Sequence, residues 1–359
     1  MKSISYTVAE ISRGIQGLDP LWSERARCRL DRLTKPRGSL GELEAIAQRM
    51  VAIREAESFP ELKKMVYVFA ADHGIAIEGV SAYPKEVTRQ MVMNFLSNGA
   101  AINVLARLHG AELIVVDVGV EGDFAAIPGM VHRKVRRGTR NMLREPAMSE
   151  DEVDCAFEVG LDLAESARRN GCALVAVGEM GIGNTTSASA ITAALTGQAP
   201  ALVTGKGTGV NPEAYAHKIR VVESLVEKHF PRGEGSSDPL KVLCSVGGLE
   251  IAAMTGMMLG AARHRMAVIV DGFISTAAAA IAYAVEPRVK DYLFAGHASE
   301  EPGQQFLFDF IGLKPILSLH MRLGEGTGAV LAIPVIESAV RLYSEMATFA
   351  SAGVSEAKP

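Results

Sequence analysis

Apolar, β-branched runs recur along the chain, and each ends near a glycine, an aspartate or a glutamate. They are Met65 to Gly74, Ala111 to Val120, Cys172 to Gly183, Met266 to Gly272 and the shorter Tyr292 to His297. Runs that are apolar on both faces suit parallel strands with helices on each side. Helical patterns such as Lys85 to Gly110 and Ser149 to Gly171 lie between them. The alternation predicts an α/β fold with a doubly wound, mostly parallel sheet flanked by helices.

Both ends of the chain have helical rather than strand patterns. Leu40 to Ala56 reads as a helix, and the sequence after Ile333 reads as one long helix through Ala350. We therefore expect residues 1–64 and 334–359 to form a small helical domain beside a large α/β domain of residues 65–333. A length of 359 residues suits one large domain and a lesser one.

Charge and hydropathy exclude several classes of partner. The chain has 37 basic and 41 acidic residues and no run of like charges, so we expect no nucleic-acid partner. The most apolar segment, Ala267 to Val285, is interrupted by Asp271 and Gly272, and we interpret it as a strand, a turn and a helix rather than a membrane span. The first residues have no continuous apolar segment typical of a signal peptide. We expect a cytoplasmic protein with no membrane partner.

The four cysteines are Cys28, Cys155, Cys172 and Cys244. They are far apart and none is in a CxxC pair, which argues against a zinc site and against a secreted disulfide framework. A reducing compartment agrees with the cytoplasmic prediction.

Acidic residues follow several of the predicted strands. The carboxyl ends of parallel strands lie along one edge of the sheet, which is where such folds bind ligands. We therefore expect Asp72, Asp117, Glu179 and Asp271 near one edge.

The segment GEMGIGNTTSASA, from Gly178 to Ala190, forms the predicted turn between a strand and a helix, with Asn184 or Thr185 at the N-cap. Glycines such as Gly181 and Gly183 allow close approach of a ligand, and the free amides at a helix start favour a phosphate. A tight turn with small packing residues explains the spacing equally well.

Two further glycine-rich turns make a nucleotide-sized ligand the better explanation. One contains Gly207 and begins the stretch Thr204 to Glu223; the other lies in Met321 to Ala332. None of the three fits GxGxxG with a following acid or GxxxxGK[ST], so dinucleotide and ATP binding are disfavoured.

Glu325 lies between two glycines in RLGEGTG, where little neighbouring bulk would prevent contact with a substrate. An acid that only complements a helix dipole is the simpler interpretation of this position alone. Asp72 and His73 could form an acid/base or metal pair, but a hydrogen-bonded structural pair is more common, and no second histidine has ligand spacing. We predict no metal site and no cofactor.

Seven segments together resemble the nicotinate-nucleotide–dimethylbenzimidazole phosphoribosyltransferase family. In chain order these segments are KPRGSLGELE, DHGIAIEGVSAYPKEVTRQM, VDVGV, GEMGIGNTT, VGGLEIAAMTGMMLGAAR, DGFISTAAAA and RLGEGTGA. The resemblance implies transfer of ribose 5-phosphate from nicotinate mononucleotide to 5,6-dimethylbenzimidazole during cobalamin synthesis. It also implies a homodimer with a large α/β catalytic domain and a small helical domain.

Carried over to this chain, the family's motifs imply roles for individual residues. Glu325 corresponds to the catalytic glutamate of RLGEG, and Glu179 to a second active-site glutamate. The phosphate-side residues are Gly181, Gly183, Asn184, Thr185 and Thr186, with Gly207 in the second glycine-rich turn and Lys218 in the helix after it. The benzimidazole pocket includes Leu323 and the stretch from Tyr83 to Met91, where other members have a serine before the proline and a glutamine further on.

Two other functions fit parts of the sequence. A transferase using phosphoribosyl pyrophosphate would have an acidic pair after a strand to bind magnesium, and none is present. A nucleotide-binding regulatory protein would keep the glycine-rich turns, but it has no evident need for the carboxylate of Glu325.

Overall fold

The computed structural model describes residues 4–59, 61–124, 127, 129–231 and 238–355. The strands in this part of the chain are β1 (Lys64–Ala71), β2 (Glu112–Gly119), β3 (Met130–His132), β4 (Leu174–Met180), β5 (Ala267–Val270), β6 (Leu293–His297) and β7 (Pro315–Leu317). The helices there are α1 (Ile4–Gly14), α2 (Pro20–Leu30), α3 (Glu42–Arg54), α4 (Glu86–Leu96), α5 (Ala101–Leu108), α6 (Glu150–Arg169), α7 (Asn184–Thr196), α8 (Pro200–Val203), α9 (Pro212–His229), α10 (Pro239–Val246), α11 (Leu249–Arg263), α12 (Phe273–Val285), α13 (Gly303–Ile311), α14 (Thr327–Glu345) and α15 (Phe349–Ala352), with short 3-10 helices η1 (Gly74–Glu78) and η2 (Pro287–Tyr292).

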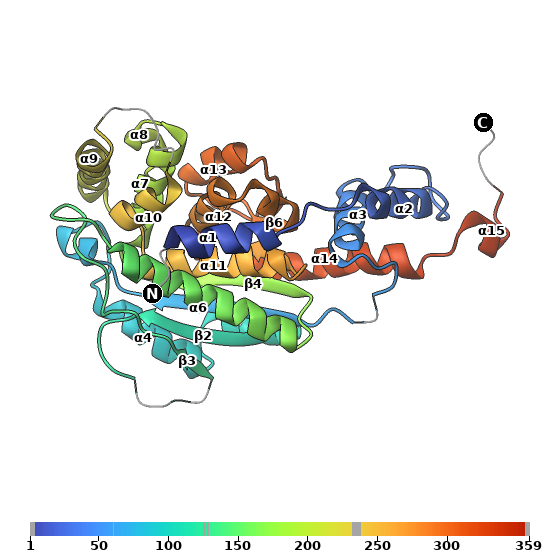
Figure 1. Cartoon of the computed structure of the whole chain (residues 1–359), viewed down its shortest axis with the longest axis horizontal. Coiled ribbons are helices and arrows are strands. Elements are labelled where there is room, and N and C mark those ends of the chain that lie inside the picture. Colours follow the sequence, from blue (N-terminus) through green and yellow to red (C-terminus); the bar gives the residue numbers. More distant parts are fainter. Residues whose placement is uncertain (1–3, 60, 125–126, 128, 232–237, 356–359) are drawn as a thin grey trace.

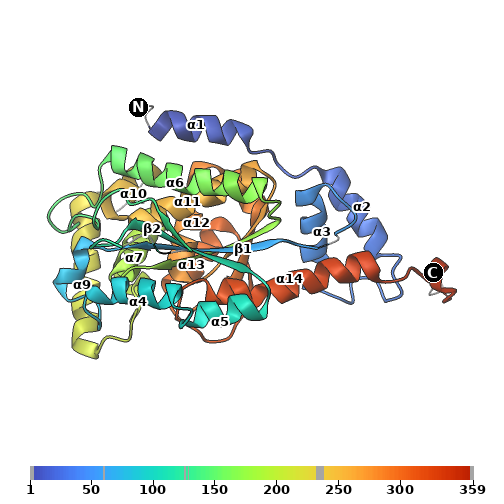
Figure 2. The ribbon, with the colours of Figure 1, turned by 90° about the horizontal axis from the view of Figure 1, so that it is seen from below.

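The strands of the described residues form one seven-stranded sheet in the order β3-β2-β1-β4-β5-β6-β7, and every adjacent pair is parallel. Helices α6 and α11 cover one face, and α4, α5 and α14 cover the other (Figure 2). The predicted doubly wound parallel sheet is confirmed. The chain reverses its direction of winding between β1 and β4, and such a reversal opens a crevice beyond the carboxyl ends of the strands.

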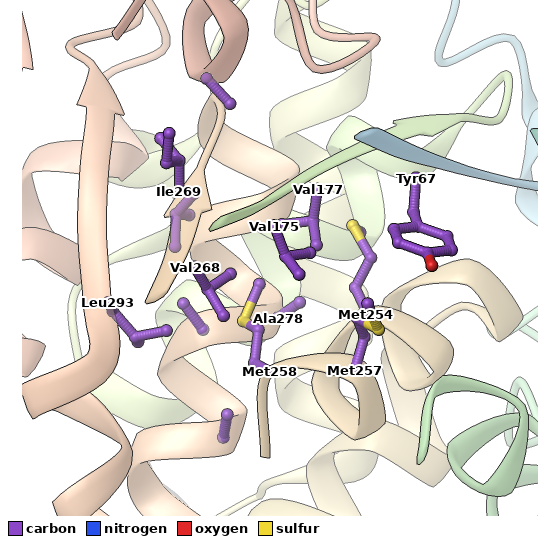
Figure 3. Packing of buried hydrophobic residues seen from close by; sticks show 14 of the residues in the cluster. Tyr67, Val175, Val177, Met254, Met257, Met258, Val268, Ile269, Ala278 and Leu293 are labelled. Carbon is purple, nitrogen blue, oxygen red and sulfur yellow. The ribbon is translucent and has the colours of Figure 1, made fainter. Parts of the chain in front are cut away.

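The core is continuous from the sheet into α11. Val175 and Val177 are two residues apart on β4, so both side chains point to the same face, where they meet Met254 and Met258 (Figure 3). This burial on both faces explains why the strands read as unbroken apolar runs.

Helices α6 and α11 approach each other through glycines. A Cβ at Gly160 would lie 2.0 Å from the carbonyl oxygen of Ala253, and one at Gly256 would lie 2.1 Å from that of Phe157. Any side chain at either glycine would push the two helices apart.

The capping box predicted for the helix after Ser149 is present. The Ser149 hydroxyl accepts from the Glu152 amide at 3.2 Å, and the Glu152 carboxylate accepts from the Ser149 amide at 2.8 Å.

The segment expected as one helical region from residue 85 to 110 is two helices, α4 and α5, separated at Ser97 to Ala100. Asn98 there has a positive φ of 61°, which a continuous helix does not allow.

The two chain ends meet at one end of the molecule, where α2, α3 and the far end of α14 lie together (Figure 1). Arg29 donates to the carbonyl oxygen of Tyr343 at 2.8 Å, and Leu33 pairs with Thr348 in an isolated bridge. Helix α1 lies instead against α6 and α11, so the first helix packs on the α/β layers (Figure 2). The domain limits at 64/65 and 333/334 stay a prediction.

Candidate functional site

A cavity of about 370 Å³ lies beyond the carboxyl ends of β4, β5 and β6. Its wall is formed by Tyr83, Val87, Met91, Glu179, Met180, Gly181, Ile182, Asn184, Thr185, Gly207, Thr208, Gly272, Phe273, Ile274, Ser299, Glu301, Arg322, Leu323, Gly324 and Glu325. A larger hollow of about 550 Å³ lies between α3 and the β6–β7 edge, but none of the predicted site residues lines it. We assign the site to the smaller cavity because it gathers the buried carboxylates and the glycine-rich turns.

The structure brings most of the predicted site residues to this one cavity. Those that line it are Tyr83, Met91, Glu179, Gly181, Asn184, Thr185, Gly207, Leu323 and Glu325. Gly183, Thr186 and Lys218 lie behind the wall: Gly183 packs on the segment after β1, and Thr186 and Lys218 are fully buried.

The turn that carries Glu325 has three consecutive residues in the left-handed region. The φ angles are 83° at Gly324, 63° at Glu325 and 88° at Gly326. A glutamate rarely adopts this conformation, so the two glycines and the surrounding packing must hold it there. Such local strain at a carboxylate that faces a cavity is typical of a functional residue.

Two neighbours fix this turn. The carboxylate of Asp271, just after β5, accepts hydrogen bonds from the amides of Gly326 and Ala329, both at 3.0 Å. Gly178 of β4 has no room for a side chain, because a Cβ would lie 2.3 Å from the Gly326 amide nitrogen. The turn therefore rests directly on the strand.

Burial raises the pKa of Glu325 to about 7, and the nearby Asp271 carboxylate adds to the effect, while the backbone amide of Ile102 opposes it. The side chain is 5% exposed, and its Oε2 atom has no hydrogen-bond partner among the described residues. A carboxylate whose pKa lies near neutrality is suited to take up a proton.

Glu179 lies beneath the same turn, because a Cβ at Gly324 would be 2.4 Å from its Oε1 atom. Its other oxygen accepts a hydrogen bond from the side-chain amide of Asn184. Burial raises the pKa of Glu179 to about 8, and the charges of Glu250, Asp271 and Glu325 add to the effect. Burial therefore raises the pKa of two adjacent carboxyl groups toward neutrality.

Helix α7 begins one or two residues earlier than the sequence suggested. The N-cap is Gly183, with φ 99° and no side-chain cap, so the expectation of Asn184 or Thr185 at this position is wrong. The side chain of Asn184 is thus free to bond the carboxyl group instead of the helix end.

Lys218, from α9, is fully buried behind Thr185 and Gly207. Its Nζ atom donates to the Thr185 hydroxyl at 2.8 Å, and burial lowers its pKa to about 8 while Glu301 acts in the opposite direction. Glu301 accepts from the Gly207 amide at 2.8 Å, which links the second glycine-rich turn to the segment after β6. An anion at the Thr185 end of the cavity would thus meet a buried cation.

The opening of the cavity is apolar. Met91 is half-buried, while Tyr83 and Leu323 are exposed at the opening, with 55% and 56% of their surface accessible. The Thr208 hydroxyl accepts from the Ala82 amide at 3.0 Å, which attaches this loop to the second glycine-rich turn. The arrangement fits a flat, largely apolar ring.

The sequence prediction missed several residues of the wall, among them Phe273, Ser299, Glu301 and Arg322. Arg322 lies inside the RLGEGTG motif itself, and Nη1 donates to the carbonyl oxygen of Gly207 at 3.1 Å. The other three follow β5 or β6 within a few residues. Their position after a strand was the signal that could have found them.

Asp72 and His73 do not form the expected pair. Asp72 accepts from the Glu121 amide at 2.6 Å, and His73 contacts Glu250 at 2.6 Å. Glu250 is far away in the sequence, so the motif alone could not reveal it. Asp72 and Asp117 lie at the predicted edge of the sheet but outside the cavity wall.

Within the described ranges, no group of three or more His, Cys, Asp or Glu side chains is arranged to hold a metal ion. Nor does any helix of the described residues have the length and apolarity needed to cross a bilayer.

A family model described as a phosphoribosyltransferase matches residues 15–354. The nicotinate-nucleotide–dimethylbenzimidazole phosphoribosyltransferase of Geotalea uraniireducens is 54% identical over 344 residues, which cover 95% of this chain and 96% of that protein. The chain belongs to this family. The phosphoribosyltransferase of the same name from Chloroflexus aggregans is 52% identical over 341 residues, with 95% and 96% coverage. The resemblance expected from the seven segments is confirmed.

The fold of this phosphoribosyltransferase is also shared with a solved structure. The crystal structure of CobT from Thermus thermophilus aligns with a TM-score of 0.89 and 46% identity, and covers 94% of this chain and 100% of that one. The chain is therefore a phosphoribosyltransferase whose cavity lies in a shared fold.

Proposed function

We propose that this chain transfers ribose 5-phosphate from nicotinate mononucleotide to 5,6-dimethylbenzimidazole, giving α-ribazole 5'-phosphate and nicotinate. The names of its relatives support these substrates. The cavity supports them too, since it has a buried cation behind its wall at Thr185, an apolar opening and two buried carboxyl groups.

Glu325 is the proposed general base. As a nitrogen of the benzimidazole bonds to C1 of the ribose, the ring gains positive charge, and loss of the proton from its other nitrogen relieves that charge. The Glu325 carboxylate is the proton acceptor, because its raised pKa, about 7, and its unpartnered Oε2 suit it to this step.

The leaving group needs no proton. Nicotinate in its mononucleotide is a pyridinium, so the electron pair of the breaking C–N bond neutralises the ring nitrogen. A single base therefore suffices, in contrast to the two carboxylates of a glycosidase. Attack opposite the departing ring inverts the anomeric carbon and converts a β-nucleotide into an α-nucleotide.

Glu179 is the proposed hydrogen-bond donor beside this base. Its raised pKa, about 8, favours the protonated form near neutral pH, so it can donate a hydrogen bond to a ribose oxygen.

The phosphate of the nucleotide is proposed to bind where Thr185, Gly207 and Lys218 meet. Replacing the Thr185 hydroxyl as the partner of Lys218 would give the phosphate a charge-assisted hydrogen bond. This anchor fixes the ribose with its two faces toward the leaving group and the acceptor.

We also propose that the enzyme is a homodimer with the predicted division into a helical and an α/β domain, as the family resemblance implies. The contact between the chain ends through Arg29 and Tyr343 supports a separate helical lobe.

The observation that carries the proposal is the strained, buried Glu325 facing the cavity. Purified protein incubated with nicotinate mononucleotide and dimethylbenzimidazole, without added metal, should release nicotinate and α-ribazole 5'-phosphate in equal amounts by chromatography. Absence of both products, with the nucleotide still bound, would reject the proposed reaction.

The rate should depend on pH with an acid limb near 7. Below that value Glu325 takes up a proton and can no longer act as a base, so kcat/KM should fall about tenfold per pH unit. Because the pKa of Lys218 is lowered to about 8, its ammonium group should lose its proton above that pH, and the KM for the nucleotide should rise. Initial rates between about pH 5.5 and 9.5 measure both limbs, and a rate that does not change below pH 7 would contradict the assignment of the base.

A further inference from the structure

Beneath the cavity, three buried side chains from separate elements are joined. His73, which follows β1, contacts Glu250 of α11 through Nε2 at 2.6 Å and Ser187 of α7 through Nδ1 at 3.2 Å. The side chains of His73 and Glu250 are both 0% exposed. None of the three lines the cavity, so none can touch a substrate there.

The imidazole of His73 lies between Gly248 and Gly181 of the turn before α7. A Cβ at Gly181 would lie 3.3 Å from its Cδ2 atom, and one at Gly183 would lie 3.4 Å from its Cβ atom. On the other side, a Cβ at Gly248 would lie 2.4 Å from its Cε1 atom. Two of these glycines belong to the turn before α7, so this turn rests on the histidine.

The same turn holds the groups that face the cavity. Three of its backbone amides donate hydrogen bonds. The Ile182 amide donates to the hydroxyl of Thr88 at 3.0 Å. The amides of Asn184 and Thr186 donate to the carbonyl oxygens of Gly181 at 3.1 Å and Gly183 at 3.0 Å, respectively. A shift of the turn would move Asn184 away from Glu179 and Thr185 away from Lys218.

The Ser–His–Glu arrangement does not have the properties of a hydrolytic triad. The Ser187 hydroxyl is buried and donates to the carbonyl oxygen of Gly247 at 3.2 Å. With no access to the cavity, it cannot reach a substrate bond. A supporting role agrees with its position.

We propose that His73 and Glu250 are positioning residues: their buried pair holds the Gly181–Thr186 turn in the geometry that receives the substrate phosphate. The link to the phosphate rests on the proposed function, whereas the link to the turn does not. The charge of Glu250 also helps to raise the pKa of Glu179, in agreement with its place directly below the site.

The test measures two variants, His73→Ala and Glu250→Gln, against a control variant, Glu286→Ala. Amide hydrogen exchange is measured without substrate, and KM and kcat are measured by steady-state kinetics. Glu250→Gln keeps the volume and a hydrogen bond to His73. Glu286 is a buried carboxylate before β6, at the opposite edge of the sheet, where it bonds Arg288 at 2.7 Å. Its removal costs stability without touching the turn.

In His73→Ala, the amides of Ile182, Asn184 and Thr186 should exchange at least about tenfold faster, while those of β1 are unchanged. The KM for nicotinate mononucleotide should rise about tenfold, with the KM for dimethylbenzimidazole within about twofold of wild type. Glu250→Gln should retain most of the wild-type exchange protection and of the wild-type KM for nicotinate mononucleotide. Glu286→Ala should change neither quantity.

Unchanged exchange of the turn in folded His73→Ala would overturn the proposal, as would an equal rise of both KM values. If His73→Ala does not fold, His73→Asn replaces it, because asparagine retains a group near Ser187 and loses the contact with Glu250. A wild-type protein without transferase activity would reject the proposed function, while the exchange rates would still decide whether His73 holds the turn.

Discussion

Replacing Glu325 by glutamine should lower kcat about 10²- to 10⁴-fold, the usual contribution of general acid–base catalysis. Glutamine has nearly the same shape but cannot accept the benzimidazole proton. The KM for nicotinate mononucleotide should stay within about threefold of wild type, because the phosphate anchor is untouched. Steady-state kinetics with both substrates measure the two effects.

Stability separates this loss from damage to the fold. The pKa of Glu325 rises from 4.5 to about 7 on folding, so the folded state binds more protons than the unfolded state in that range. The contribution of Glu325 to stability therefore falls as pH rises from about 4.5 to 7. At about pH 8 Glu325→Gln should unfold at the same or a higher temperature than wild type. Glu337→Gln on α14, which weakens the partly buried ion pair of Glu337 with Lys64, is the control and should retain full turnover. Wild-type kcat in Glu325→Gln would remove Glu325 from the role of base.

Replacing Lys218 by methionine should raise the KM for nicotinate mononucleotide roughly 10- to 100-fold, which corresponds to the loss of one charge-assisted hydrogen bond of about 1.5–3 kcal/mol. Methionine fills most of the buried volume, so the fold should persist. The KM for dimethylbenzimidazole should change little, because Lys218 contacts Thr185 and is not among the apolar residues of the cavity wall. Isothermal titration with the nucleotide alone gives the same comparison without turnover.

Lys228→Met is the matched control on the same helix. Lys228 is exposed and donates to the carbonyl oxygen of Leu143, away from the cavity. Its replacement should leave both KM values at wild type. An effect of Lys218→Met confined to the benzimidazole would contradict the phosphate assignment.

The strands of the sheet interior were predictable because burial on both faces leaves a continuous apolar run. β3 and β7 were not, since each has three residues at an edge of the sheet and leaves no pattern long enough to read. The break between α4 and α5 was also missed, because a left-handed Asn98 is a local backbone feature inside a sequence that otherwise favours helix.

The glycines show where a correct pattern had an incomplete explanation. The sequence predicts that Gly181 and Gly183 make room for a phosphate, yet Gly181 also lies against the ring of His73 and Gly183 against its Cβ atom. That ring pairs with Glu250, which lies 177 positions further along the chain. A single sequence does not reveal contacts of this range, so the support of the site could be found only in the folded structure.

Helix α14 runs from the turn that carries Glu325 to the lobe formed by the chain ends. At about 1.5 Å per residue, its 19 residues span roughly 28 Å, with a proline at position 334 inside them. One continuous helix thereby joins the turn that holds Glu325 to a remote lobe. A genetic variant or a fusion tag that loosens the lobe could be mistaken for an active-site lesion, although it alters neither the substrates' contacts nor the charges around them.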